Sequence, residues 1–140
     1  MIGKTIAQYR ILERLGQGDT GRVYLAEDTT LDRKVGLKVF SPAGQQDEIT
    51  HARLLRVANS AATLLHPFIC TIYEIGEDDG VFFVAMEHVE GQSLAELLRA
   101  GRLSVDYALR LGCEIAEALE VAHERGIVHR NLKPSNIMLT

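Results

Sequence analysis

The chain has 140 residues, which is enough for one ordinary domain with a hydrophobic core and too few for two. Apolar residues make up 46 % and charged residues 24 %, a balance that excludes an intrinsically disordered chain. The formal net charge is −4 and no run of Lys or Arg occurs, so we expect neither a nucleic-acid surface nor an anionic-membrane surface.

Targeting and membrane signals are weak in this sequence. Residues Met1–Thr5 lack the apolar core of a signal peptide. The longest apolar runs, such as Val81–Met86, are far shorter than the roughly 18 residues that a membrane helix needs. Cys70 and Cys113 stand far apart without metal-ligand spacing, so we expect buried free thiols in a reducing compartment. The expected location is cytoplasmic, with no membrane segment in this chain.

Two strands joined by a glycine-rich turn are predicted near the start, at residues 9–15 and 23–25. The turn carries the pattern G-x-G-x-x-G in Gly16, Gly18 and Gly21. A dinucleotide fingerprint would open a helix after the glycines, whereas the residues here favour a strand. Glycines allow backbone amides to approach phosphate oxygens, although a plain flexible hairpin explains the pattern equally well.

A turn at Asp28–Asp32 leads to a third strand at Lys34–Phe40, with Lys38 between apolar neighbours. An exposed strand lysine is the simplest interpretation of Lys38. The next stretch, Asp47–Leu65, has apolar residues at helical spacing and predicts a helix with a broad apolar face.

A pair of strands is predicted at Phe68–Ile75 and Gly80–Met86, around a turn at Gly76–Gly80. The polar, glycine-ended stretch Glu87–Gly91 follows. It predicts a connection between this sheet and the helices that come next.

Two helices are predicted in the last third of the chain. Ser93–Ala100 suits a short helix. Ser104 is placed to cap a longer helix that runs through Glu124, and Gly126 is placed to end it.

The most informative stretch is Ile127–Asn136, which reads I-V-H-R-N-L-K-P-S-N. It resembles the catalytic loop H-R-D-L-x-x-x-x-N of serine/threonine protein kinases. The glycine pattern, the V-G-L-K that ends at Lys38, and His66-Pro67 resemble other motifs of this family in the same order. The resemblance extends from about Tyr9 onward, and Cys70–Gly76 is similar to bacterial members in particular.

The resemblance implies an α+β, protein-kinase-like fold. It implies an antiparallel five-stranded amino lobe with the family's C helix (1–86), a hinge (87–91) and the start of a helical carboxy lobe (92–140). The last segment would hold the family's D and E helices and the catalytic loop. The chain would then be a partial, truncated protein kinase domain over 1–140, one strand short of the family's D-F-G.

The resemblance also implies ATP as the nucleotide and magnesium as its metal. Lys38 would anchor phosphates beside the glycine turn, Lys133 would steady the transferred phosphate, and Asn136 would bind magnesium. Met86 would be the gatekeeper. The backbone of Glu87 and Val89 would hydrogen-bond the adenine edge, and Leu15, Val23, Gly36 and Met138 would lie against its two faces. Ser93 is assigned to the same nucleotide site. Ordinary core packing is the alternative for each apolar residue taken singly.

Two substitutions depart from the family pattern. Asn131 occupies the position of the catalytic Asp, and its neutral amide cannot accept a hydroxyl proton. Val57 occupies the position of the Glu that pairs with the strand lysine. With D-F-G also missing, we expect impaired catalysis and weak or absent magnesium binding.

Three interpretations therefore remain open. The chain is a kinase domain that uses ATP, a non-catalytic pseudokinase that serves as a scaffold or interaction module, or a decayed fragment without a ligand. The apolar face of the Ser104–Glu124 helix is expected to stay uncovered, which favours a protein partner or self-association.

Overall fold

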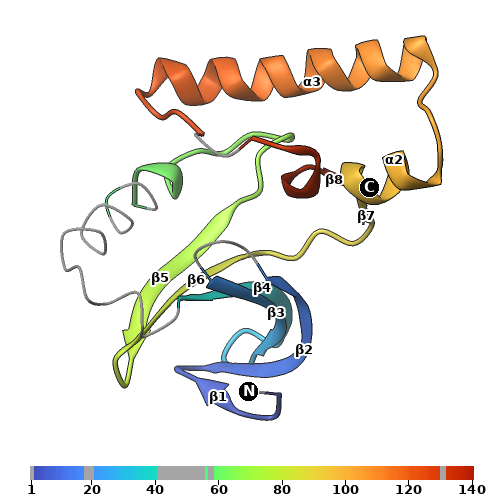
Figure 1. Ribbon diagram of the computed structural model, residues 1–140. Coiled ribbons are helices and arrows are strands. Elements are labelled where there is room, and N and C mark those ends of the chain that lie inside the picture. Colours follow the sequence, from blue (N-terminus) through green and yellow to red (C-terminus); the bar gives the residue numbers. More distant parts are fainter. Residues whose placement is uncertain (1, 18–20, 41–55, 57–58, 130–131) are drawn as a thin grey trace. The chain divides into compact units, whose positions relative to one another are not determined.

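The computed structural model describes residues 2–17, 21–40, 56, 59–129 and 132–140 (Figure 1). The chain divides into two compact units. The first unit comprises Met1–Thr63 and Thr71–His88, and the second comprises Leu64–Cys70 and Val89–Thr140.

The first unit is built on one antiparallel sheet with the strand order β1-β2-β3-β4-β6-β5. The strands are β1 (Thr5–Ile6), β2 (Tyr9–Gln17), β3 (Gly21–Asp28), β4 (Arg33–Phe40), β5 (Ile72–Asp78) and β6 (Val81–Glu87). The five expected strands are present, and the two-residue β1 adds a sixth at the edge beside β2.

Alternation along these strands separates a core face from a second face. The core side chains come from Ile6 of β1 and from every second position of β2, β3, β4 and β6, as the period of a strand requires. They are Ile6, Tyr9, Ile11, Tyr24, Ala26, Val35, Leu37, Val39, Phe83 and Ala85. Full burial of each large apolar side chain stabilises the fold by roughly 1.5–3 kcal/mol.

The connection between β5 and β6 is tighter than the predicted turn at Gly76–Gly80, and that prediction was wrong in extent. Strand β5 continues through Asp78, which pairs with Val81, so only Asp79 and Gly80 form the loop. Both loop residues have positive φ, 52° and 78°, the backbone that a two-residue hairpin turn with right-handed strand twist requires.

The turn between β3 and β4 is stabilised by Asp28, the last residue of β3. Its Oδ1 accepts hydrogen bonds from the backbone N–H of Thr30 (3.0 Å) and of Leu31 (3.2 Å). This side-chain turn satisfies two amides that a strand partner cannot reach. Asp28 is buried, so its carboxylate holds the predicted turn from inside.

The predicted strand at Phe68–Ile75 starts four residues too early, because β5 begins at Ile72. Residues 66–69 instead form a turn in which Ile69 N–H donates to the His66 carbonyl (3.1 Å) and Phe68 N–H donates to His66 Nδ1 (3.1 Å). Pro67 cannot donate a ladder hydrogen bond, which favours this turn over a strand.

The helix predicted over Asp47–Leu65 lies mostly outside the described residues. Its described part is helical at residue 56 and at 59–61. The helix ends there, four residues before the predicted end, and a turn follows in which Thr63 N–H donates to the Ser60 carbonyl (3.2 Å).

The second unit contains α2 (Leu94–Ala100), α3 (Val105–Glu124), the short 3-10 helix η2 (Pro134–Asn136), and a strand pair of β7 (Gln92–Ser93) with β8 (Met138–Leu139). Both predicted helices are confirmed. The Ser93 hydroxyl accepts from Glu96 N–H (3.1 Å) at the start of α2, and the Ser104 hydroxyl accepts from Tyr107 N–H (3.2 Å) at the start of α3. Each serine satisfies one of the unpaired amides of a helix start.

Two further observations concern the whole described chain. Cys70 and Cys113 are free but exposed, so the expectation that they are buried was wrong. In the part of the chain that the structure describes, no helix is both long enough and apolar enough to cross a membrane.

Candidate functional site

The second face of the first unit's sheet carries four of the predicted nucleotide-site residues. Gly36 of β4 pairs with Met86 of β6, and Lys38 of β4 pairs with Val23 of β3. These positions alternate with the core residues of the same strands, so their side chains lie on the face away from the core cluster. The sheet therefore brings four of the predicted residues together on three adjacent strands.

Gly36 and Met86 are fitted closely to one another. A Cβ on Gly36 would lie 3.2 Å from Met86 Cγ and 3.6 Å from the Glu87 carbonyl oxygen. Any larger residue at position 36 would press on the methionine side chain. Glycine at this position leaves the sheet surface beside Met86 without a side chain.

The glycine turn lies between the end of β2 and the start of β3. A Cβ on Gly21 would lie 2.3 Å from the Val39 carbonyl oxygen, so only glycine allows β3 to approach β4 at this point. A Cβ on Gly16 would meet nothing within 4 Å. Leu15, beside it, is exposed. Gly18 lies outside the described residues.

Lys38 is half-buried in the middle of this face. Its Nζ lies 5.6 Å from the centre of the Phe40 ring, two residues along the same strand, within the range of a cation–π contact. The predicted loss of the lysine's ion pair depends on Val57, which lies outside the described residues, and it stays a prediction.

Two further residues of the same face were not singled out from the sequence. Val84 pairs with Lys38 across β4 and β6, and Leu25 pairs with Gly36 across β3 and β4. Both are buried. The alternation of β3 and β6 was the available signal, since each residue lies two positions from a predicted one, Val23 or Met86.

Glu87 closes β6 and is tied to the segment before β5. Its N–H donates to the Thr71 carbonyl (2.8 Å), and its Oε1 accepts from the Thr71 N–H (3.3 Å). These two bonds fix the backbone at the point where the predicted hinge begins.

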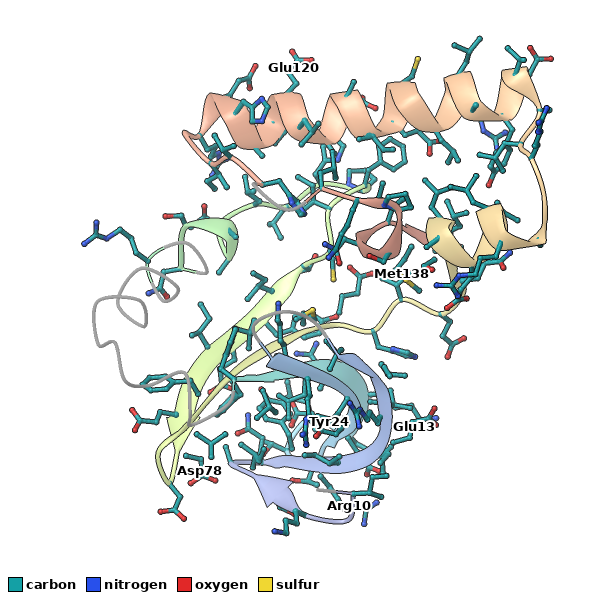
Figure 2. The ribbon with its side chains drawn as sticks, viewed as in Figure 1. Arg10, Glu13, Tyr24, Asp78, Glu120 and Met138 are labelled. Carbon is teal, nitrogen blue, oxygen red and sulfur yellow. The ribbon has the colours of Figure 1, made fainter. Side chains whose placement is uncertain are left out.

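In the second unit, Ser93 and Met138 are neighbours across the β7–β8 pair. Ser93 is buried and its hydroxyl caps α2, so local structure already accounts for this residue. Met138 is 44 % exposed on β8, where Figure 2 labels it. Val89, four residues before Ser93, is half-buried.

The predicted loop residues Lys133 and Asn136 flank η2. Lys133 precedes this helix and Asn136 is its last residue, and Asn136 N–H donates to the Lys133 carbonyl (2.9 Å). Both side chains are exposed. Asn131, at the position of the catalytic Asp, lies outside the described residues. Among the described residues, no group of three or more His, Cys, Asp and Glu side chains is placed to bind a metal.

Comparison with known proteins identifies the class to which this arrangement belongs. The sequence profile of the protein kinase domain matches residues 9–140. The chain therefore belongs to the protein kinase family.

Individual relatives narrow the comparison to bacterial serine/threonine kinases. The chain is 42 % identical over 141 residues to serine/threonine-protein kinase PrkC of Bacillus subtilis and 41 % identical over 140 residues to PknD of Mycobacterium tuberculosis. It spans 22 % and 21 % of their lengths, respectively. The crystal structure of the Mycobacterium tuberculosis PknI kinase domain superimposes on the whole chain with a TM-score of 0.88 at 34 % identity, and the chain covers 58 % of that structure. The chain is thus an amino-terminal portion of such a domain, and the protein-kinase-like fold expected from the sequence is confirmed.

Proposed function

We propose that this chain is the nucleotide-binding portion of a serine/threonine protein kinase domain and that its ligand is ATP. The observation that carries the proposal is the sheet face on which Val23, Gly36, Lys38 and Met86 lie in register. The apolar surface around Gly36 suits a purine ring, and the Lys38 ammonium beside it suits the phosphates.

The phosphates are assigned to the glycine turn and Lys38. Gly21 is required by its approach to Val39, and a side chain at Gly16 would project into open space. A turn without side chains at these positions presents backbone N–H groups to an anion. The Lys38 ammonium supplies the compact charge that phosphoryl transfer enzymes use on phosphate oxygens.

The adenine is assigned to Leu15, Val23, Gly36 and Met86 of the first unit. Because Glu87 N–H already donates to Thr71, the contribution of Glu87 to the adenine edge falls to its carbonyl oxygen.

Lys133 is assigned to the transferred phosphate and Asn136 to magnesium. Magnesium, when bound, neutralises charge on the nucleotide phosphates. Asn136 fits the ion as a single amide-oxygen ligand beside phosphate oxygens. We therefore expect weak magnesium binding.

Phosphoryl transfer is proposed to be impaired by two substitutions. Asn131 cannot take the proton of an acceptor hydroxyl, and loss of a positioned base costs about 10²–10⁴ in rate. Val57 supplies no charge to hold Lys38 against the phosphates. The proposed role is therefore nucleotide binding with little transfer, in the cytoplasm, where the free thiols of Cys70 and Cys113 stay reduced.

Thermal shift with ATP tests this proposal. Saturating ATP is expected to raise the melting temperature of the wild-type chain and of Lys34→Ala, and to leave Lys38→Ala unshifted. Lys34 is a matched control because it lies on the same strand and is exposed. An ATP response that is absent, or that is equal in all three proteins, contradicts the proposal. A response independent of magnesium favours the pseudokinase interpretation.

A second candidate, a non-catalytic interaction module, is favoured by α3. Val105 is 74 % exposed and Leu109 is 64 % exposed, and both lie on one side of the helix with the exposed Cys113, at spacings of four residues. An exposed apolar stripe of this kind suits a second copy of the chain or a protein partner.

Sedimentation velocity separates this candidate from the first. If α3 mediates self-association, the wild-type chain sediments as a dimer or larger species and Leu109→Lys is monomeric. Glu114→Lys, about 140° around the same helix from Leu109, behaves as wild type. A monomeric wild-type chain at high concentration argues against self-association through α3.

A further inference from the structure

Residues 7–9, which form the turn after β1 and the start of β2, make polar contacts with β5 at the other end of the strand order. Ala7 N–H donates to Asp78 Oδ2 (2.7 Å). Gln8 Nε2 donates to Glu74 Oε2 (3.0 Å), and the Tyr9 hydroxyl donates to the same carboxylate oxygen. Strands β3, β4 and β6 separate β2 from β5 in the ladder, so backbone pairing does not account for these contacts.

Residues 7–9 also contact the turn after β3 and the Phe83 ring of β6. The Gln8 carbonyl accepts from Thr29 N–H (3.0 Å) and from Thr29 Oγ1 (2.7 Å), in the turn after β3. The Tyr9 ring is buried and meets the Phe83 ring edge to face, with the two centroids 5.6 Å apart. The segment therefore bridges the β3–β4 turn and β5.

The backbone of this segment is unfavourable when taken alone. Ala7 has φ 51°, in the left-handed region that residues with a Cβ rarely occupy. Such a conformation persists only where surrounding contacts enforce it. The bond from Ala7 N–H to Asp78 is one of those contacts, and a charged acceptor makes it a strong one.

We propose that Glu74 and Asp78 act as a carboxylate clamp that closes the sheet by holding the start of β2 against β5. Asp78 lies at the end of β5 beside the hairpin loop, where Figure 2 labels it. The clamp makes residues 3–9 a unit that can open locally, because its long-range hold on β5 rests on two side chains. Strand β2 runs from this clamp to the glycine turn, so the clamp also fixes the origin of the strand that carries that turn.

Native-state amide hydrogen exchange on the full chain tests the clamp. In the double variant Glu74→Gln/Asp78→Asn, the amides of Ala7 and Ile11 are expected to exchange at least about tenfold faster, because hydrogen bonds to charged acceptors are replaced by weaker neutral ones. Ile11 reports on the same segment because its N–H donates to the Lys4 carbonyl (2.9 Å). The amide of Leu37, in the buried β4, is expected to change little.

Glu77→Gln is the matched control, since Glu77 is an exposed carboxylate on the same strand. In this variant, the amides of Ala7 and Ile11 are expected to exchange as they do in the wild-type chain. The single variant Asp78→Asn, isosteric and confined to the exposed end of β5, keeps the test usable if the double variant folds poorly. Unchanged exchange at Ala7, or acceleration at Leu37 equal to that at Ala7, would overturn the proposal, because the clamp would then be either without effect or part of the global fold.

Discussion

At the scale of single residues, folding alters the acidity of the Tyr9 hydroxyl. Tyr9 is 2 % exposed, and its hydroxyl donates to Glu74. Burial raises the pKa of this hydroxyl well above its ordinary value, and the bond to Glu74 raises the pKa further, because both disfavour the phenolate. The folded state therefore holds the Tyr9 proton more tightly than the unfolded state does.

This difference predicts that the free energy of unfolding falls at alkaline pH. The stabilisation is fully present below the unfolded tyrosine pKa of about 10 and is lost as the pH rises above it, because the unfolded chain then releases a proton that the folded chain retains. Tyr9→Phe is expected to be less stable than wild type near neutral pH and to lose less additional stability between about pH 8 and about pH 11. Denaturant midpoints at the two pH values measure this. An equal alkaline loss in both proteins would show that Tyr9 is not the responsible group.

The contact between Tyr9 and Glu74 also marks a limit of sequence analysis. The two residues are 65 positions apart, and no pattern in the sequence links one to the other. The role of Tyr9 in the core follows from strand alternation, but its hydroxyl partner depends on how far the sheet curls. Nothing in the local pattern predicts that curl.

At the scale of elements, the β5–β6 hairpin shows what local chemistry does determine. Asp-Gly between two alternating runs is the usual signal of a two-residue turn, and the structure places the turn at Asp79-Gly80. The broader predicted turn treated Gly76 as a turn residue as well. Gly76 instead lies within β5, where it pairs with Phe83, and a Cβ there would come 2.6 Å from Phe83 Cζ.

Gly76→Ala is therefore expected to destabilise the chain by about 1–3 kcal/mol, the usual cost of overpacking beside a buried ring. Gly112→Ala, in the exposed part of α3 where a Cβ meets nothing within 4 Å, is expected to stabilise it by about 0.5–1 kcal/mol. Urea unfolding of both variants measures the two free energies. A Gly76→Ala variant as stable as wild type would mean that Phe83 can move aside.

The cap of α3 permits a second test at this scale. Ser104→Ala removes the acceptor of Tyr107 N–H and is expected to cost about 1 kcal/mol, because one amide of the first helical turn loses its partner. Ser104→Asp is expected to retain most of the stability, since Asp is also a good cap. Thermal unfolding followed by circular dichroism compares the two. Equal loss in both variants would contradict the capping role.

At the scale of the whole molecule, the order of strands and helices was predictable, whereas the composition of the site was predictable only in part. The resemblance to protein kinases selected Val23, Gly36, Lys38 and Met86 one by one. Their alignment on one face depends on strand register, which is set by pairing across β3, β4 and β6. Val84, which pairs with Lys38, was missed because no motif includes it.

The central claim is that this sheet face binds the nucleotide. Titration of the isotope-labelled chain with ATP and magnesium, followed by amide NMR, tests it most directly. Saturable shifts are expected at Val23, Gly36, Lys38 and Met86, with little change at the amide of Ala26 in the core of β3. Absence of shifts at these four residues at millimolar ATP, or shifts confined to other parts of the chain, would contradict the account.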